Sequence, residues 1–435
     1  MEKFFKLKEH GTDIKTEVLA GITTFMTMAY ILSVNPAMLS LQGTGAENLG
    51  MDFGAVFTAT ALSAVIATLV MALYANLPFA LAPGMGLNAF FAYEIVLQMG
   101  YSWQFALTAV FLEGIIFILL TLVNVREAII NCIPMNVKKA ISVGIGLFIA
   151  TIGFAGTGLI VTGGGTILDL GNMTNPSVIL ALIGLVITGV MLVKNVKGAL
   201  LWGILGTTII GIPMGVTPMP QAIVSAPPSI SSTFLQFDFQ NIFTKDMLYV
   251  LFVFLFVDMF DTVGTLVGVS TKADMLEADG KVPNASKALM ADAIGTTVGA
   301  CLGTSTTTTF VESAAGVAEG GRTGLTSLVT AIMFAIALFF APFFAIIPTA
   351  ATAPALILVG LFMMAPIKEI DFEDFTEAIP AFLTLILMPL TYSIANGIAF
   401  GMTSYIILKV LSGRYKEVSW VTYVVGLLFI VKFMV

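Results

Sequence analysis

The chain has 435 residues, of which 58% are hydrophobic and only 10% are charged. No soluble domain needs so much apolar surface, whereas a polytopic membrane protein does. The net charge of −7 does not indicate which partners the protein binds, because the acidic residues lie mostly in loops. The single histidine, His10, leaves almost nothing for a histidine metal site or a Ser-His-Asp triad. We therefore expect a membrane protein that is not an enzyme, with no metal, no cofactor and no nucleic-acid partner.

Fourteen apolar segments are candidates for membrane spans, which need about 17–25 residues. They lie near 17–40, 55–76, 84–99, 103–123, 138–160, 177–193, 198–215, 246–268, 287–303, 306–320, 325–345, 350–366, 376–393 and 396–412. Residues 1–16 form a charged leader. In the C-terminal tail, 413–435, the apolar stretch 418–434 is either a fifteenth span or an interfacial helix. This pattern predicts an all-α polytopic protein of the cytoplasmic membrane.

The lysines and arginines predict the orientation of these spans. If the N-terminus is cytoplasmic, seventeen of the 19 basic residues fall on the cytoplasmic side, and the exceptions are Lys245 and Lys432. The loops 41–54, 162–176 and 214–240, which are then outside, contain neither lysine nor arginine. The agreement supports both the orientation and the count of fourteen spans.

Two of the spans are interrupted at matching positions. Fourteen spans divide into two sets of seven, and because seven is odd the second set enters from the opposite side, which gives an inverted repeat. The third span contains Pro-Gly-Met-Gly at 83–86, and the tenth begins with Gly-Thr-Ser-Thr-Thr-Thr-Thr at 303–309. Irregular backbone at membrane depth survives only inside the protein or beside a cavity. The pair of interruptions therefore indicates a transporter with its binding site near the bilayer midplane.

Six acidic residues fall inside the predicted spans: Glu94, Glu113, Asp258, Asp261, Asp292 and Glu312. A carboxylate at membrane depth costs at least roughly 2.5–3.5 kcal/mol. No lysine or arginine lies inside the first fourteen spans, beyond their ends, to neutralise these groups. This favours a carrier coupled to a cation, and the residues themselves leave both proton and sodium open.

The acidic residues differ in their expected roles. Asp258 lies near the middle of the eighth span and is the first candidate for binding the substrate or carrying a proton. Asp261 shares its helix face, with β-carbons about 5–6 Å apart, and is either a ligand or a support. Glu312 should occupy the first turns of a half-helix, where free N–H groups face a ligand, and Asn88 has a similar place in the third span. Asp292 is either a proton-coupling residue or a tie between helices.

We interpret Glu94 and Glu113 as residues near the mouths of the protein or in bundle contacts. The hydroxyls of 304–309 either satisfy unwound backbone or face a ligand carbonyl, and Thr308 is our candidate for the second role. Phe90 and its aromatic neighbours lie near enough to stack a flat ring. A planar heterocycle with N–H donors and a carbonyl acceptor fits these residues better than a sugar or a bare anion.

Four stretches in order resemble the AzgA-like purine permeases: TEVLAGITTFMTMAY at 16–30, PGMGLNAFF at 83–91, DMFDTVGT at 258–265 and GTSTTTTFVESAAG at 303–316. The resemblance extends over about residues 4–417. It implies symport of hypoxanthine, guanine or adenine with protons. By position in the motifs it implies purine contacts from Asn88, Asp258 and Glu312, with Gly86 and Asp261 in support.

The resemblance also implies a fold similar to that of the uracil and nucleobase–ascorbate carriers. A core of spans 1–4 (17–123) and 8–11 (246–345) would move like an elevator against a gate of spans 5–7 (138–215) and 12–14 (350–412), in a homodimer. The main alternative is a sulfate- or bicarbonate-type anion carrier, which shares the design of seven plus seven spans, although no basic residue lies near the tenth span. A channel and a membrane enzyme are weaker alternatives.

Overall fold

The computed structural model describes residues 2–122, 135–163, 167–220, 222–272, 275, 282–420, 422–423 and 426. Within these ranges nine helices are long and apolar enough to cross a membrane, and the apolar helices Ala199–Gly211 and Phe375–Thr391 are shorter. The prediction of a helical polytopic membrane protein is therefore confirmed, but two short strand pairs depart from the all-α fold that we predicted. The count of fourteen spans in two sets of seven remains a prediction. Most of 418–434, whose placement the sequence left open, lies outside the described residues.

The chain forms two compact units. Unit 1 comprises Met1–Leu122 and Gly156–Ala355, and unit 2 comprises Val123–Ala155 and Leu356–Val435. The division into a moving core and a gate concerns a transport cycle, and it remains a prediction.

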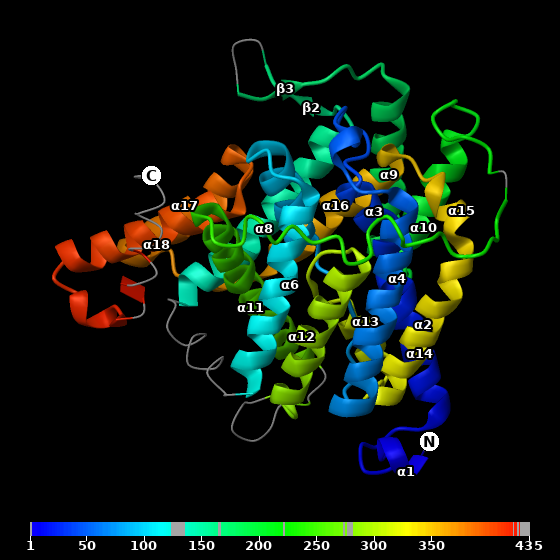
Figure 1. Ribbon diagram of the computed structural model, residues 1–435, viewed down its shortest axis with the longest axis horizontal. Coiled ribbons are helices and arrows are strands. Elements are labelled where there is room, and N and C mark those ends of the chain that lie inside the picture. The colour runs from blue at the N-terminus through cyan, green and yellow to red at the C-terminus, as the bar shows by residue number, and fades with distance from the viewer. Residues whose placement is uncertain are drawn as a thin grey trace. The chain divides into compact units, whose positions relative to one another are not determined.

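The first part of unit 1, drawn from blue to cyan, is mainly helical (Figure 1). Its elements are α1 (Glu2–Phe5), α2 (Ile14–Met28), α3 (Ile31–Leu39), η1 (Glu47–Leu49), α4 (Phe53–Val70), η2 (Met71–Ala75), β1 (Leu81–Pro83), α5 (Met85–Ala89), η3 (Phe90–Gln98) and α6 (Trp103–Leu122). The segments η2 and η3 are π-helical.

The second part of unit 1 contains β2 (Ile160–Val161), β3 (Asp169–Leu170), α9 (Pro176–Val193), α10 (Ala199–Gly211), α11 (Lys245–Lys272), α12 (Ala285–Leu302), β4 (Thr307–Thr309), α13 (Ser313–Ala318), α14 (Gly324–Ala337), η4 (Leu338–Phe340) and α15 (Ala341–Ala345). The helix α16 (Thr349–Met363) begins in unit 1 and ends in unit 2. Unit 2 further contains nearly all of α8 (Met135–Gly156), η5 (Ala365–Glu369), α17 (Phe375–Thr391), α18 (Ile394–Leu411) and η6 (Tyr415–Glu417).

Polar side chains determine where several of the spans begin. The carboxylate of Asp13 accepts a hydrogen bond from Thr16 N (3.0 Å) at the start of α2, and that of Asp52 accepts one from Ala55 N (2.8 Å) at the start of α4. Each satisfies a backbone N–H that the first helical turn leaves without an intrahelical partner. Such a cap typically stabilises a helix by about 1 kcal/mol.

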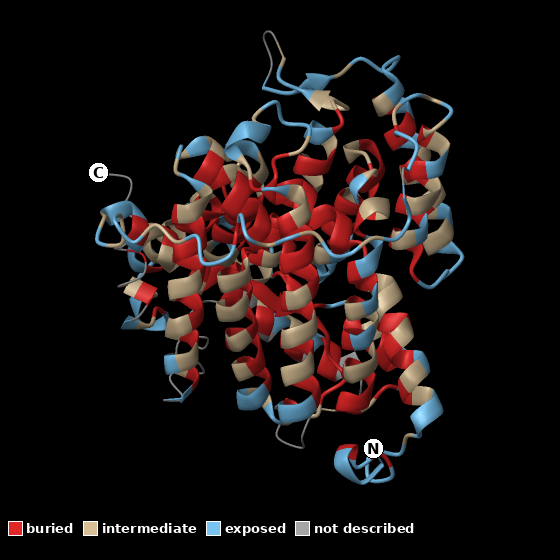
Figure 2. Cartoon of the chain, turned by 45° about the vertical axis from the view of Figure 1, so that its right-hand side comes forward, coloured by how far each residue is buried: buried red, intermediate tan, exposed pale blue. Residues whose placement is uncertain are grey.

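Small residues allow the helices of unit 1 to approach one another closely. A Cβ added to Gly21 on α2 would lie 2.5 Å from the carbonyl oxygen of Thr326 on α14, and one added to Gly295 on α12 would lie 2.6 Å from Ala67 of α4. Small residues are the usual basis of helix packing in membranes, where there is no hydrophobic force between helices. The buried positions accordingly lie where these helices face one another (Figure 2).

The first span, predicted at 17–40, is a single candidate span, Ile14–Leu39, that contains a local turn. The helix α2 ends at Met28 and α3 begins at Ile31, with a turn at Ala29 and Tyr30. Neither glycine nor proline marks this position, and Pro36 lies further along, within α3. The sequence pattern therefore gives no sign of this turn, in which Ala29 and Tyr30 keep right-handed helical backbone angles.

Candidate functional site

The two interrupted spans meet as a short antiparallel strand pair, β1 with β4, which we call the crossed strands. Their register is Leu81↔Thr309, Ala82↔Thr308 and Pro83↔Thr307. Two more bonds extend the pair, from Gly84 N to Thr306 O (2.9 Å) and from Phe310 N to Ala80 O (3.0 Å). The helices α5 and α13 follow the strands, so the interruptions predicted at 83–86 and 303–309 are confirmed.

A local two-fold axis relates the crossed strands and their supports. Thr68 on α4 donates its hydroxyl to Leu81 O (3.2 Å) and accepts from Leu81 N (3.0 Å). Thr296 on α12 bonds Thr307 O (3.0 Å) and Thr307 N (3.2 Å) in the same way. An axis through the central residue pair exchanges Leu81 with Thr307. Each threonine thus replaces a missing neighbour strand, which satisfies backbone groups that lipid cannot.

Five consecutive hydroxyl side chains, at 304–308, connect the interrupted segment 303–309 to five helices. Thr304 accepts from Asn35 of α3 (2.9 Å), Ser305 donates to Asn88 of α5, Thr306 donates to Glu113 of α6 (2.6 Å), Thr307 bonds Ser63 of α4 (2.7 Å) and Thr308 bonds Thr262 of α11 (2.9 Å). The hydroxyl-rich sequence therefore has a structural role in addition to any contact with a ligand.

Thr262 brings three of the predicted site residues together. Its hydroxyl lies 3.2 Å from Asp258 Oδ1, 3.0 Å from Asp292 Oδ2 and 2.9 Å from Thr308 Oγ1. All four side chains are buried, so neither carboxyl group faces lipid. A hydroxyl has one hydrogen to donate. Thr262 can therefore serve only one of the two carboxylates at a time, while Thr308 can donate to Thr262.

Asp261 and Glu312 lie at the partly exposed side of this cluster. A Cβ added to Gly84 would be 3.8 Å from Asp261 Oδ2, which places Asp261 beside the break in the third span. Asp261 is also close enough to Asp292 and Glu312 for their charges to interact. Asp258, Asp261, Asp292 and Glu312 thus gather at the crossed strands, although they come from three separate segments.

Glu312 is held by two residues of the first span, Thr27 and Tyr30. It occupies the position directly before α13 and not the first turns that we predicted, and its Oε1 accepts a hydrogen bond of 2.6 Å from the hydroxyl of Tyr30. Thr27 donates to the Glu312 backbone carbonyl (3.4 Å). Tyr30 is fully buried and lies in the turn between α2 and α3. This contact was missed at the level of sequence, because Tyr30 is 282 residues away from its partner.

The remaining predicted residues are in or next to α5. Asn88 accepts from Ser305 through Oδ1 and donates to Pro83 O (3.4 Å). Gly86 is buried within α5. The Phe90 ring is fully buried and packs edge-to-face with Phe254, with centroids 4.9 Å apart. In this conformation Asn88 and Phe90 are engaged with the protein itself.

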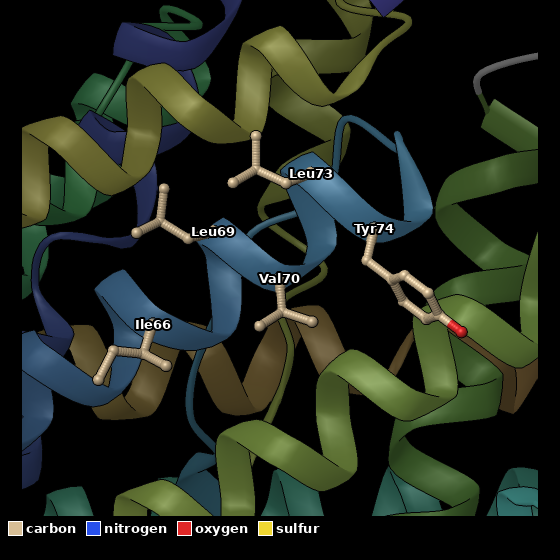
Figure 3. A pocket seen from close by; sticks show the side chains of 5 residues that line it. All are labelled: Ile66, Leu69, Val70, Leu73 and Tyr74. Carbon is tan, nitrogen blue, oxygen red and sulfur yellow. The ribbon is translucent and has the colours of Figure 1, made fainter.

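A shallow surface groove lies away from the predicted site residues. It is an open apolar groove of about 360 Å³ on α4 and η2, lined by Ile66, Leu69, Val70, Leu73 and Tyr74 (Figure 3). None of the predicted site residues lines it. Among the described residues, no group of three His, Cys, Asp or Glu side chains is arranged to hold a metal ion.

Buried acidic groups at two interrupted, crossed spans define a membrane carrier. The chain belongs to the Permease family, whose model matches residues 15–400. It is therefore a permease and not an enzyme, and the resemblance to the AzgA-like purine permeases is confirmed.

Relatives match along nearly the whole chain. A putative permease of Methanocaldococcus jannaschii is 53% identical, over 100% of this chain and 98% of the relative. The guanine/hypoxanthine permease PbuG of Bacillus subtilis is 46% identical, over 100% and 99%. The adenine permease AdeQ of Escherichia coli is 42% identical, over 99% and 96%.

The fold is shared with a carrier of another kind. The transmembrane domain of the cyanobacterial bicarbonate transporter BicA aligns with a TM-score of 0.65 at 18% identity, covering 89% of this chain and 96% of that chain. At this identity the likeness shows the fold alone.

Proposed function

We propose that the protein takes up purine nucleobases across the cytoplasmic membrane together with protons. The main support is the cluster of carboxyl groups at the crossed strands, which combines with relatives named as guanine/hypoxanthine and adenine permeases. A purine presents N–H donors in the plane of a flat ring. Asp258 and Glu312 accept those hydrogens, while Asn88 accepts or donates.

The binding step requires the site to exchange internal hydrogen bonds for bonds to the purine. The Glu312 carboxylate accepts from Tyr30 and from its own backbone N–H, and its two oxygens have further lone pairs that can accept from a ligand. Thr262 shares its single hydrogen between Asp258 and Asp292, so a purine N–H at Asp258 would let Thr262 donate to Asp292. Asn88 would turn from Ser305, and the Phe90 ring would form one apolar wall. Gly86 keeps the backbone of α5 free of a side chain.

The same carboxyl groups supply a reason for coupling to protons. A charged, empty site is expensive to carry through an apolar barrier, whereas a protonated and loaded site is not. A proton taken up outside with the purine and released inside would therefore move with the core. Asp261 and Asp292, close to Asp258 and Glu312, are the groups that share this charge. The proposal also includes an inverted repeat of seven plus seven spans with a cytoplasmic N-terminus. We further propose that the core moves against the gate and that the protein is a homodimer.

An anion carrier is the alternative function, because the bicarbonate transporter BicA has a similar fold. Four carboxyl groups at the crossed strands would repel an anion, and an oxyanion site prefers lysine or arginine. Within the described part of unit 1, every lysine and arginine lies near a helix end or in a loop.

Uptake into proteoliposomes tests the proposal. Labelled hypoxanthine should accumulate when the outside is acidic, without sodium, and unlabelled guanine or adenine should compete where sulfate and bicarbonate do not. Accumulation that needs sodium at both of two pH values would overturn the proton coupling. Competition by sulfate without competition by any purine would overturn the substrate class.

A further inference from the structure

Glu113 is a buried acidic residue that the proposed transport mechanism does not use. It lies on α6, which packs against α11 and α12 (Figure 1), and its side chain is 0% exposed. The next residue, Gly114, is so close to α12 that an added Cβ would lie 2.4 Å from Thr297 Oγ1 and 2.8 Å from Thr297 N. The carboxyl group is therefore held inside the bundle and not at a mouth of the protein.

The partner of Glu113 connects it to both interrupted spans. The Thr306 hydroxyl donates to Glu113 Oε2 at 2.6 Å, and the Thr306 carbonyl accepts from Gly84 N at 2.9 Å. Thr306 comes directly before β4, and Gly84 comes directly before α5. One residue thus carries a side-chain bond to α6 and a backbone bond to the third span. A carboxylate acceptor makes the first bond roughly twice as strong as a neutral one.

The position of this bond relative to the candidate site gives it a consequence for binding. Ser305, next to Thr306, donates to Asn88, and the space beside Gly84 is occupied by Thr308 and by Asp261. Any shift of Thr306 therefore moves residues that face the substrate.

We infer that Glu113 is a positioning residue for the substrate site, which acts by holding Thr306 and, through it, the crossed strands. This inference rests on the proposed transport of purines, but it adds a residue that does not touch the substrate. A purely structural Glu113 would affect the amount of folded transporter. A positioning Glu113 affects the Michaelis constant more than the maximal rate, because the folded molecules present a misaligned site.

The test is a double-mutant cycle on Glu113 and Thr306, measured as uptake of labelled hypoxanthine, guanine and adenine in proteoliposomes. Glu113→Leu and Thr306→Val should each raise the Michaelis constant about tenfold, which corresponds to about 1.4 kcal/mol, with the maximal rate changed less than about twofold. The Michaelis constant of the double variant should not exceed that of the more impaired single variant, because both changes remove the same interaction. Glu113→Gln and Thr306→Ser keep an acceptor and a hydroxyl, and both should stay near the wild-type value.

Thr121→Val is the matched control. Thr121 is also buried on α6, but its hydroxyl bonds the carbonyl of Phe117 in the same helix (2.7 Å), so the Michaelis constant should not change. The inference is overturned if Glu113→Leu and Thr306→Val lower only the maximal rate, or if their effects add in the double variant. If Glu113→Leu does not fold, Thr306→Val and Thr306→Ser decide alone. Failure of the wild type to take up any of the three purines would instead refute the proposed function.

Discussion

The substitution Gly84→Ala tests whether the geometry of the crossed strands determines substrate affinity. Gly84 has φ −76° and ψ 128°, which alanine adopts equally well, so the backbone is not strained by the change. The added Cβ would lie 2.5 Å from Thr308 Cγ2. Carbon atoms pack at about 3.5–4.0 Å, so one of the two strands must move by about 1 Å.

Thr308 cannot relieve this overlap by a simple rotation. It is β-branched, and its hydroxyl bonds Thr262 at 2.9 Å. Overpacking of this kind typically costs about 1–3 kcal/mol. If the strain appears in the substrate-bound state, the Michaelis constant for hypoxanthine uptake should rise by about 5- to 150-fold.

A second substitution makes the prediction specific. Thr308→Ser removes Cγ2 and keeps the hydroxyl, so the double variant Gly84→Ala, Thr308→Ser should recover most of the affinity. Gly189→Ala on α9, where no heavy atom lies within 4 Å of the added Cβ, is the control and should transport normally. Uptake should be normalised to the amount of monodisperse protein. A Michaelis constant within twofold of wild type for Gly84→Ala, or no recovery in the double variant, refutes the reasoning.

Two further predictions concern other contacts. Tyr30→Phe removes the 2.6 Å hydrogen bond to Glu312. Since a bond to a charged group contributes about 1.5–3 kcal/mol, the Michaelis constant for hypoxanthine should rise by about tenfold. An unchanged Michaelis constant would exclude a role for this bond in binding. In unit 2, hydrogen bonds from Arg414 lower the pKa of Asp374 and of Glu417 to about 2, from ordinary values of 3.8 and 4.5. This contribution to stability is complete above about pH 4.5 and is lost as the pH falls through about 2. The difference in melting temperature between wild type and Arg414→Gln should therefore be constant from pH 7 to 5 and should shrink below pH 4, and shrinkage already between pH 7 and 5 would contradict it.

The interruptions and the acidic residues could be predicted because each has a local signal. Glycine and proline at 83–86 and the hydroxyl run at 303–309 break an otherwise apolar pattern. A carboxylate in an apolar span is easily recognised, because placing its charge in the bilayer costs free energy and therefore needs a functional or structural reason. These two signals marked Asp258, Asp292 and Thr308 as candidates, whereas their meeting at Thr262 is seen only in the structure.

The partners of these residues could not be predicted, because they depend on the packing of distant segments. Tyr30 resembles any aromatic residue of a membrane helix until its hydroxyl is seen on Glu312. Thr262, four residues from Asp258, has the spacing at which a threonine usually bonds its own helix. Glu113 was interpreted as a residue near a mouth or in a bundle contact, and its bond to Thr306 is a bundle contact whose place beside the crossed strands the sequence could not show.

Direct binding of hypoxanthine to the purified, detergent-solubilised protein tests the central claim, which is that Asp258 and Glu312 receive the purine at the crossed strands. Calorimetry should detect binding to the wild type and to Asp374→Asn, which alters a carboxylate far along the chain in unit 2. Asp258→Asn and Glu312→Gln should each bind at least about tenfold more weakly. Wild-type affinity in both site variants would contradict the account.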